Sequence, residues 1–339
     1  MKKLTRREFL KLAGASTLGA LLYGTGCAPK ATESVAVPPA PTGLPGNPPT
    51  NPAASDTPAS TNTPESPPAA GQAYLAVGRG ADPALITRAA IAALGGMGRF
   101  VQAGQEVVIK PNICVDYHPP EYAATTNPFV VAALVGLCLE AGAKRVSVMD
   151  NPFGGPPESA YANSGIAEAV KAAGGEMVVM SPVKYGQYDI PQGRDIKAWE
   201  FYRDVMEAGV VINVPIAKHH SLAGLTLGGK NMLGVITRAN QIHRNLGQRI
   251  ADLVSAVRPE LTVVDAVRIL RDHGPTGGSL DDVQQANTVI ASHDIVSADA
   301  YAATLFGMTG ADIAYVKAAA EMGLGSLDLS SLKIEEINF

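Results

Sequence analysis

The chain has 339 residues, a formal net charge of -4 and an aromatic content of only 5%. It carries no basic stretch with interleaved aromatic residues, so nucleic acid is excluded as an expected partner. After the N-terminal segment no apolar run is long enough to cross a bilayer, and about 265 residues remain for one large or two small domains.

The first 27 residues have the pattern of an export signal. Lys2, Lys3, Arg6 and Arg7 precede an apolar stretch from Leu12 to Tyr23, which is too short to span a membrane as a mature helix. The arginine pair resembles a twin-arginine signal, and that export route carries folded proteins, often with a cofactor already bound. The alternative is a soluble amphipathic helix, which the glycines between residues 14 and 26 would weaken.

Residues 24–27 resemble a lipoprotein cleavage box that ends in Cys27, although Gly24 stands where leucine is usual. Lipidation of Cys27 would anchor the protein to the membrane on its extracytoplasmic side. Without lipidation, the mature protein would be periplasmic or secreted. Residues 28–72 are rich in Pro, Ala, Ser and Thr and have almost no large apolar residue, which predicts a disordered tether.

Residues 73–339 are predicted to form an α/β domain. Short β-branched runs alternate with helical patterns, which is typical of a mostly parallel sheet with helices on both faces, in one or two lobes. The predicted strands are residues 73–77, 107–109, 145–149, 177–180, 210–214, 261–264 and 288–291. The predicted helices are residues 128–141, 159–173, 198–207, 248–257, 295–306 and 313–322. Their ends are marked by Asn127–Pro128 at a start and by Gly142, Gly174 and Gly323 at ends.

Apart from Cys27, the cysteines of the chain are Cys114 and Cys138. Two cysteines cannot ligate a cubane cluster, so no iron-sulfur cluster is expected. A disulfide between them is one alternative. A buried thiol is favoured instead, because Cys138 lies on an apolar helix face.

Polar residues follow several predicted strands at the point where each ends. In open α/β sheets ligands bind at the carboxyl ends of the strands, so we expect one site at this rim. Its candidate residues are Lys110, Asn112, Asp150, Lys218, His220 and Asp265. The alternative for each of them taken singly is a solvated loop charge or a helix cap.

A glycine-rich segment joins this rim, from Lys218 to Lys230. Gly228 and Gly229 are expected to offer free backbone N–H groups to a phosphate or carboxylate, with Lys218 and Lys230 as flanking cations. The segment is not a P-loop, because Asn231 stands where the magnesium-binding hydroxyl would be. A nucleoside triphosphatase is therefore disfavoured, and a small anionic molecule is the expected ligand.

Several motifs together resemble the family known as domain of unknown function 362. They are Ile109–Asn112, Asn213–His220, Lys230–Gly234, Asp265 with Gly274–Gly278, and Val296–Ala300. The resemblance covers nearly all of the chain after the tether. The family is largely uncharacterised, so it implies little about activity.

A local resemblance adds a more specific hypothesis. The spacing from His220 through Gly224, Gly228 and Gly229 to Lys230 is similar to a block of the lactate racemase family. That resemblance implies an acid/base role for His220 and a covalent link from Lys230 to a nickel pincer nucleotide. It implies nickel ligation by His243, at a shorter interval than in that family, and His118 is a positional candidate for a second catalytic histidine.

Acidic residues leave a divalent-metal site open as well. Asp150 and Asp265 follow strands and could bind a hard cation with Asn112, or orient a histidine. Asp299 opens a predicted helix and could instead accept backbone N–H groups. Residues 273–278 read first as a mobile turn and second as a lid or anion-binding loop.

Two classes of function therefore compete. The first is an exported, cofactor- or metal-dependent enzyme that acts on a small anionic metabolite, with racemase-like or redox chemistry at a hydroxy-bearing carbon. Lys110, His220 and Lys230 are its candidate catalytic residues. The second is a membrane-tethered lipoprotein that binds an anion or a metal in the same rim without turning it over.

Overall fold

The computed structural model describes residues 74–339. The predicted signal at 1–27, its Cys27 and the whole of the predicted tether at 28–72 lie outside the described residues. Within residues 74–339, no helix has both the length and the apolar character that a membrane crossing requires.

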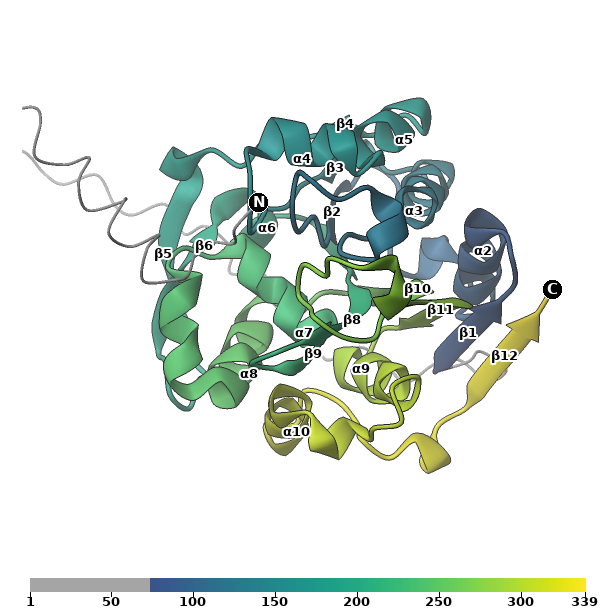
Figure 1. Cartoon of the computed structure of the whole chain (residues 1–339). Coiled ribbons are helices and arrows are strands. Elements are labelled where there is room, and N and C mark those ends of the chain that lie inside the picture. The colour runs from purple at the N-terminus through teal and green to yellow at the C-terminus, as the bar shows by residue number, and fades with distance from the viewer. Residues whose placement is uncertain (1–73) are drawn as a thin grey trace, which may run out of the picture. The chain divides into compact units, whose positions relative to one another are not determined.

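A large, mostly parallel sheet forms the centre of the fold (Figure 1). Its strand order is β12-β1-β11-β10-β7-β2-β3-β4, and β8 and β9 extend it beside β10. Strand β11 runs antiparallel to both of its neighbours, and the other pairs along this order are parallel. The bounds are β1 Leu75–Arg79, β2 Glu106–Pro111, β3 Arg145–Val148, β4 Glu176–Met177, β7 Val210–Val214, β8 Ile216–His220, β9 Gly224–Thr226, β10 Leu261–Leu270, β11 Val283–Ser292 and β12 Ile334–Asn338.

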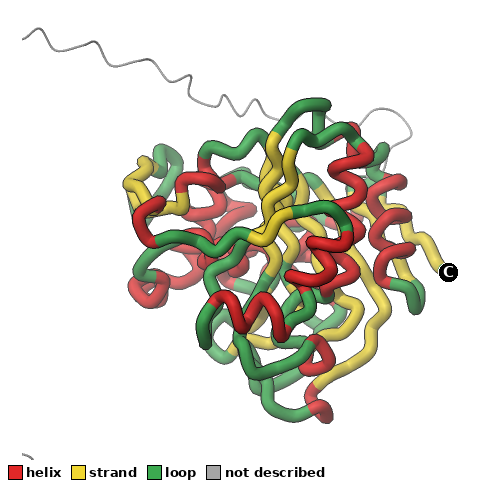
Figure 2. Tube along the Cα trace, turned by 90° about the horizontal axis from the view of Figure 1, so that it is seen from above, coloured by secondary structure: helices red, strands yellow, loops and turns green. Residues whose placement is uncertain are grey.

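Helices lie on both sides of the strands, as Figure 2 shows from above. Their bounds are α2 Pro83–Ala93, α3 Pro128–Glu140, α4 Pro157–Asn163, α5 Ile166–Ala172, α6 Arg203–Met206, α7 Gly228–Asn231, α8 Leu246–Val257, α9 Ile295–Thr304 and α10 Ala314–Glu321. The predicted fold class, an α/β fold with a mostly parallel sheet covered on both faces, is confirmed.

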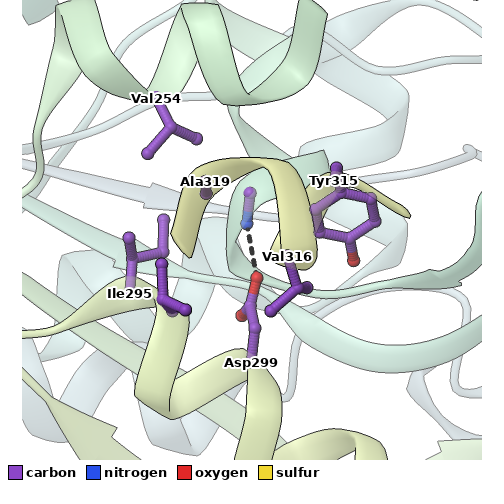
Figure 3. A pocket seen from close by; sticks show the side chains of 8 residues that line it. Val254, Ile295, Asp299, Tyr315, Val316 and Ala319 are labelled. Atoms are coloured by element: carbon purple, nitrogen blue, oxygen red, sulfur yellow. Dashed lines mark hydrogen bonds between the residues drawn. The ribbon is translucent and has the colours of Figure 1, made fainter. Parts of the chain in front are cut away.

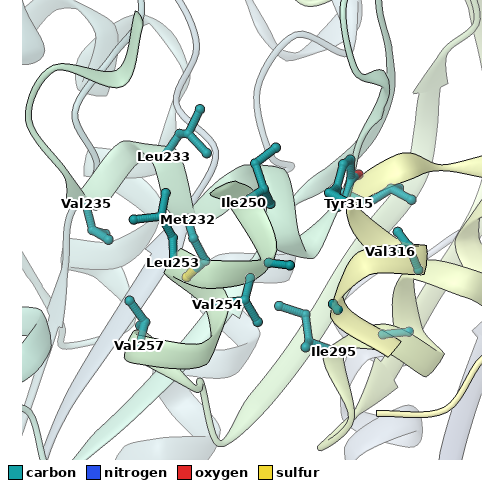
Figure 4. Close-up of a cluster of buried hydrophobic side chains, with 14 of the residues drawn as sticks. Met232, Leu233, Val235, Ile250, Leu253, Val254, Val257, Ile295, Tyr315 and Val316 are labelled. Atoms are coloured by element: carbon teal, nitrogen blue, oxygen red, sulfur yellow. The ribbon is translucent and has the colours of Figure 1, made fainter. Parts of the chain in front are cut away.

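Two apolar clusters flank the sheet because successive strand residues face opposite sides. In β2, Val107 and Ile109 belong to the cluster under α2 and α3, whereas Val108 belongs to the other. The second cluster fills the space between α8, α9 and α10. Figure 4 shows Met232 and Leu253 on one side of this cluster and Val316 on the other. Strands β2 and β7 of this sheet carry short runs of consecutive buried apolar residues, because both faces of the sheet are covered.

The predicted capping residues at helix ends are confirmed. Asn127 accepts a hydrogen bond from the Phe129 N–H at the start of α3, and Pro128 occupies the first turn. Gly142, Gly174 and Gly323 all adopt positive φ just after helices end. Cys114 and Cys138 are both buried free thiols, as favoured over a disulfide.

The predicted helix over residues 198–207 is wrong. Residues 198–202 form β6, which pairs with β5 (Tyr185–Asp189) in a separate two-stranded sheet, and only 203–206 are helical as α6. Buried Trp199 and Phe201 alternate with half-buried neighbours, which is a strand period of two.

The other differences are smaller. The predicted helix 159–173 is two helices, α4 and α5, which meet where Gly165 takes a positive φ of 71°. The predicted strand 177–180 is only the two-residue β4, and α2, β8, β9 and β12 are additional elements.

Candidate functional site

A cavity of about 490 Å³ opens where the carboxyl end of β2 meets β8, β9 and α7. Most of the predicted site residues line it. They are Lys110, Asn112, Asp150, Lys218, His220, Lys230, Asn231 and His243. The structure thus brings together residues from β2, from the loop after β3 and from the glycine-rich segment. Figure 1 shows β8, β9 and α7, which contain residues of that segment, near one another.

Lys110 is tied into the protein by every hydrogen bond that its ammonium can donate. Its Nζ lies 2.7 Å from Asp150 Oδ1, 2.8 Å from Asn231 Oδ1 and 2.9 Å from the Pro111 carbonyl oxygen. Burial lowers the pKa of Lys110 and raises the pKa of Asp150, and the charge of each partner opposes the shift of the other. The lysine predicted to be catalytic is therefore a structural cation in this geometry.

Asn231 connects this ion pair to neighbouring strands. Its Oδ1 also accepts a hydrogen bond from Asn112, at 3.0 Å. Its Nδ2 donates to the Lys110 carbonyl oxygen and to Asn213 Oδ1, at 3.2 and 2.8 Å. The predicted ligand-binding side chain thus organises the cavity wall, because the amide's donors and acceptor are all engaged by protein groups.

Lys218 forms the second cationic wall of the cavity. The side chain is 1% exposed, and Nζ donates to Asn112 Oδ1 at 2.9 Å and to the Ala124 carbonyl oxygen at 2.6 Å. Neither of these acceptors carries a full charge, so neither neutralises the ammonium of Lys218. Burial lowers the pKa of Lys218, because water that would stabilise the charge is excluded.

Lys230 differs from both of these lysines. It is half-buried on α7, and among residues 74–339 no hydrogen-bond acceptor or carboxylate pairs with its ammonium. Burial, and after it the positive charge of Lys218, lowers the pKa of Lys230 to about 8. A substantial fraction of this side chain is therefore a neutral amine slightly above neutral pH.

His220 is a neutral hydrogen-bond donor in this cavity. Its Nδ1 accepts hydrogen bonds from the backbone N–H groups of Leu222 and Ala223, at 3.1 and 3.3 Å. The proton of the neutral ring must therefore lie on Nε2. Burial, followed by the charge of Lys230, lowers the pKa of His220 to about 3, so the ring stays uncharged near neutral pH.

Sequence reasoning missed several lining residues, among them Thr226 and Cys114. Thr226 is 3% exposed, and its Oγ1 has no hydrogen-bond partner among the described residues. Cys114 is also buried in the wall, with Sγ 3.6 Å from the Pro275 carbonyl oxygen. Nothing local marked Thr226, because β9 was hidden in the glycine-rich segment, whereas Cys114 lies just two residues after Asn112.

The N–H groups of the glycine pair were expected to be free, but they are hydrogen-bonded within the protein. The N–H groups of Gly228 and Gly229 donate to the two carboxylate oxygens of Asp299, at 2.6 and 2.9 Å. Figure 3 shows the second of these bonds at Asp299. A Cβ at Gly228 would lie 2.7 Å from Asp299, and one at Gly229 would lie 2.9 Å from the Tyr315 ring. The glycines are needed for this close packing, and Asp299 fixes the start of the helix that carries Lys230.

Asp265 and His118 also lie outside the cavity lining. Asp265 accepts the backbone N–H groups of Asn127 and Val267, at 2.7 and 2.9 Å, and so secures the start of α3. His118 stacks on the Tyr122 ring with centroids 4.3 Å apart. Asp265, which was expected to contact a ligand, therefore does not line the cavity. His118, the positional candidate for a second catalytic histidine, does not line it either.

A free divalent cation does not fit the cavity. Within residues 74–339, no three His, Cys, Asp or Glu side chains are grouped so that they could hold a metal ion. Asp150 already accepts Lys110 and the Ile113 N–H, and the cationic Lys218 and Lys230 would repel a metal. His243 lines the cavity, but it belongs to no group of three such side chains within residues 74–339.

The segment 273–278 packs against β8. A Cβ on Gly274 would lie 1.8 Å from the His219 carbonyl oxygen, so the backbones are in close contact. The Gly274 N–H donates to His219 Nδ1 at 3.1 Å, and Pro275 lines the cavity. The segment is therefore part of the cavity wall.

A mostly parallel sheet with a cavity at its strand ends defines an α/β protein, and the lysines that line the cavity make it the candidate functional site. A family model described as "Domain of unknown function (DUF362)" matches residues 107–304, and the chain belongs to this family.

Two known proteins are similar to the chain. The "Thylakoid-associated protein sll1697" of Synechocystis sp. (strain ATCC 27184 / PCC 6803 / Kazusa) is 27% identical over 240 residues, which are 68% of this chain and 72% of that protein. The lactate racemase apoprotein of Thermoanaerobacterium thermosaccharolyticum aligns with a TM-score of 0.40 and 16% identity. That alignment covers 66% of this chain and 54% of the racemase, so the chain spans about half of that protein.

Proposed function

We propose that the protein binds a small anionic molecule in this cavity, with Lys230 as the cation that receives it. The unpaired ammonium of Lys230 carries the proposal, because Lys110 has Asp150 whereas Lys230 has no such partner among the described residues. A half-buried charge beside a second lysine is stabilised by a bound anion. The free Thr226 hydroxyl and the His220 Nε2–H add neutral donors for it.

An enzyme built on this site would use Lys230 as a nucleophile. Its pKa of about 8 leaves enough neutral amine to attack a carbonyl or acyl group near neutral pH. The local sequence resemblance to the lactate racemase family implies a covalent link from Lys230 to a nickel pincer nucleotide. The positive charge of Lys218 would attract the phosphate of that nucleotide. When bound, such a group supplies a hydride acceptor for chemistry at a hydroxy-bearing carbon.

The tautomer of His220 favours a second candidate, a binding protein without turnover. A ring whose Nδ1 already accepts two backbone N–H groups has no free lone pair with which to take a substrate proton. In that case His220 orients the anion as a donor. The anion itself is common to both candidates.

Anion binding is tested by isothermal titration calorimetry with L-lactate, D-lactate and inorganic phosphate. We expect at least one of them to bind the wild-type chain and to lose about tenfold or more in affinity with Lys230→Met, because a charged hydrogen bond is removed. Lys144→Met, at an exposed lysine outside the cavity, is the matched control. Equal affinity of the Lys230→Met variant would contradict the proposal.

The two candidates are separated by the intact mass of protein purified from its own host. A mass increase localised to Lys230 together with stoichiometric nickel supports the enzyme. The mass of the processed chain alone, without bound metal, supports the binding protein.

A further inference from the structure

The cavity has a buried interior and an exposed mouth. Its buried lining combines the polar Lys218 and Asn231, at 1% and 2% exposure, with the apolar Leu233, at 9%. Two large apolar side chains stand at the opening, Phe153 at 78% and Leu222 at 65% exposure. A ligand that reached the lysines would therefore extend past apolar surface on its way out.

The backbone beside both apolar side chains is anchored. Before Phe153, the Asn151 N–H donates to Asp150 Oδ1 at 2.9 Å, and after it the Gly154 N–H donates to the Cys114 carbonyl oxygen at 3.0 Å. The Leu222 N–H itself donates to His220 Nδ1 at 3.1 Å. Exposed apolar groups on fixed backbone cost little further ordering when a ligand packs against them.

The size of the cavity also exceeds the need of the smallest anions. Its volume of about 490 Å³ lies within the roughly 300–1,000 Å³ typical of pockets for drug-sized ligands. A phosphate or lactate ion at Lys230 would leave the outer part, beside Phe153 and Leu222, filled by water alone.

Resting on the proposed anion site, we infer that the natural ligand is an anion that carries an apolar or aromatic group. Its carboxylate or phosphate lies at Lys218 and Lys230, and its apolar part packs against Phe153 and Leu222. The shared chemistry fits a free metabolite and the ring-bearing phosphate of a bound nucleotide equally, and the choice of probes distinguishes them.

The test compares matched ligands by calorimetry on the full chain: lactate with 3-phenyllactate, and inorganic phosphate with phenyl phosphate. We expect the phenyl compound to bind about tenfold or more tightly than its parent, since burying a ring of this size contributes at least that much. A gain in the carboxylate pair alone points to a hydroxy-acid metabolite. A gain in the phosphate pair alone points to a nucleotide, and a gain in both supports the shared chemistry.

The double variant Phe153→Ala/Leu222→Ser should bring each phenyl compound to within about twofold of its parent and leave the affinity for the parent unchanged. Both side chains are exposed, so the fold should tolerate the change. Phe129→Ala is the control, because Phe129 is 60% exposed and lies outside the cavity lining.

The failures are distinguishable. If the parent anions bind through Lys230 but the phenyl group adds nothing, or if its gain survives in the double variant, the inference is overturned and the anion site stands. If none of the four compounds binds, the proposed function falls and the inference with it.

Discussion

Two lysines of the same cavity behave differently because of their immediate partners. Lys110 meets Asp150, Asn231 and a carbonyl oxygen, whereas Lys230 has no comparable partner among the described residues. The sequence could mark both lysines, because each follows an apolar run or a glycine loop at the predicted rim. The sequence could not show which lysine has hydrogen-bond partners, because the side-chain acceptors of Lys110 lie 40 and 121 residues away along the chain.

The direction in which the Asp265 carboxylate points could not be predicted from the sequence either. It follows an apolar run, as a rim residue should, but β10 continues to Leu270 and turns the carboxylate toward the start of α3. Whether a carboxylate faces a cavity or a helix N-terminus depends on the packing of a distant helix. No spacing in the sequence records that choice.

Gly234 leaves the space that the Lys110–Asp150 ion pair occupies. A Cβ there would lie 2.1 Å from Asp150 Oδ1 and 2.6 Å from Lys110 Nζ. We expect Gly234→Ala to lower the free energy of unfolding by about 2 kcal/mol or more, because it forces apart a buried ion pair. Urea denaturation measures the change.

Gly98→Ala is the control for that substitution. A Cβ at Gly98 meets nothing within 4 Å, so its effect should stay within about 0.5 kcal/mol. Equal effects of the two substitutions would mean that Gly234 does not lie against the ion pair.

At the scale of elements, α7 is a short helix held from outside. Asp299 of α9 binds its first two N–H groups, and Asn213 of β7 donates to the Gly228 carbonyl oxygen at 3.1 Å. Lys230 and Asn231 leave this helix toward the cavity. Asp299 therefore positions Lys230 without lining the cavity.

This contact predicts a pH dependence. Burial raises the pKa of Asp299 to about 7, so the folded state holds a proton that the unfolded chain releases near pH 4. The stability contributed by Asp299 is thus greatest below pH 4 and is lost as the pH rises toward 7. The destabilisation by Asp299→Asn should be larger at pH 5 than at pH 7.5, by about 2 kcal/mol.

Urea denaturation at the two pH values measures this difference. Asp281→Asn, at an exposed carboxylate, should change the unfolding free energy little at either pH. A destabilisation by Asp299→Asn that grows with pH would show that burial does not favour the protonated form.

The elements themselves were predictable to different degrees. Strands β2 and β7 are buried on both faces and each contains a short run of consecutive β-branched apolar residues, so they stood out. The hairpin of β5 and β6 did not, because residues 198–202 mix alanine, glutamate and aromatic residues in a stretch short enough to fit a helix. Residues 198–202 form a strand because their backbone pairs with that of residues 185–189.

At the scale of the whole molecule, the N-terminal 73 residues would decide where the cavity works. We expect the wild-type protein to be membrane-bound in its own host and Cys27→Ser to shift it to the soluble exported fraction, because the lipid anchor is lost. Cell fractionation with immunoblotting measures the distribution. An Arg6→Lys/Arg7→Lys variant should remain in the cytoplasm, and normal export of that variant would contradict the twin-arginine assignment.

The most direct measurement is a crystal structure of the protein soaked in bromide, with the anion located by its anomalous scattering. We predict a bromide peak inside the cavity within hydrogen-bonding distance of Lys230 Nζ, and loss of that peak in Lys230→Met crystals. Bromide only on the outer surface, or a protein carboxylate paired with Lys230 in the crystal, would contradict the anion site.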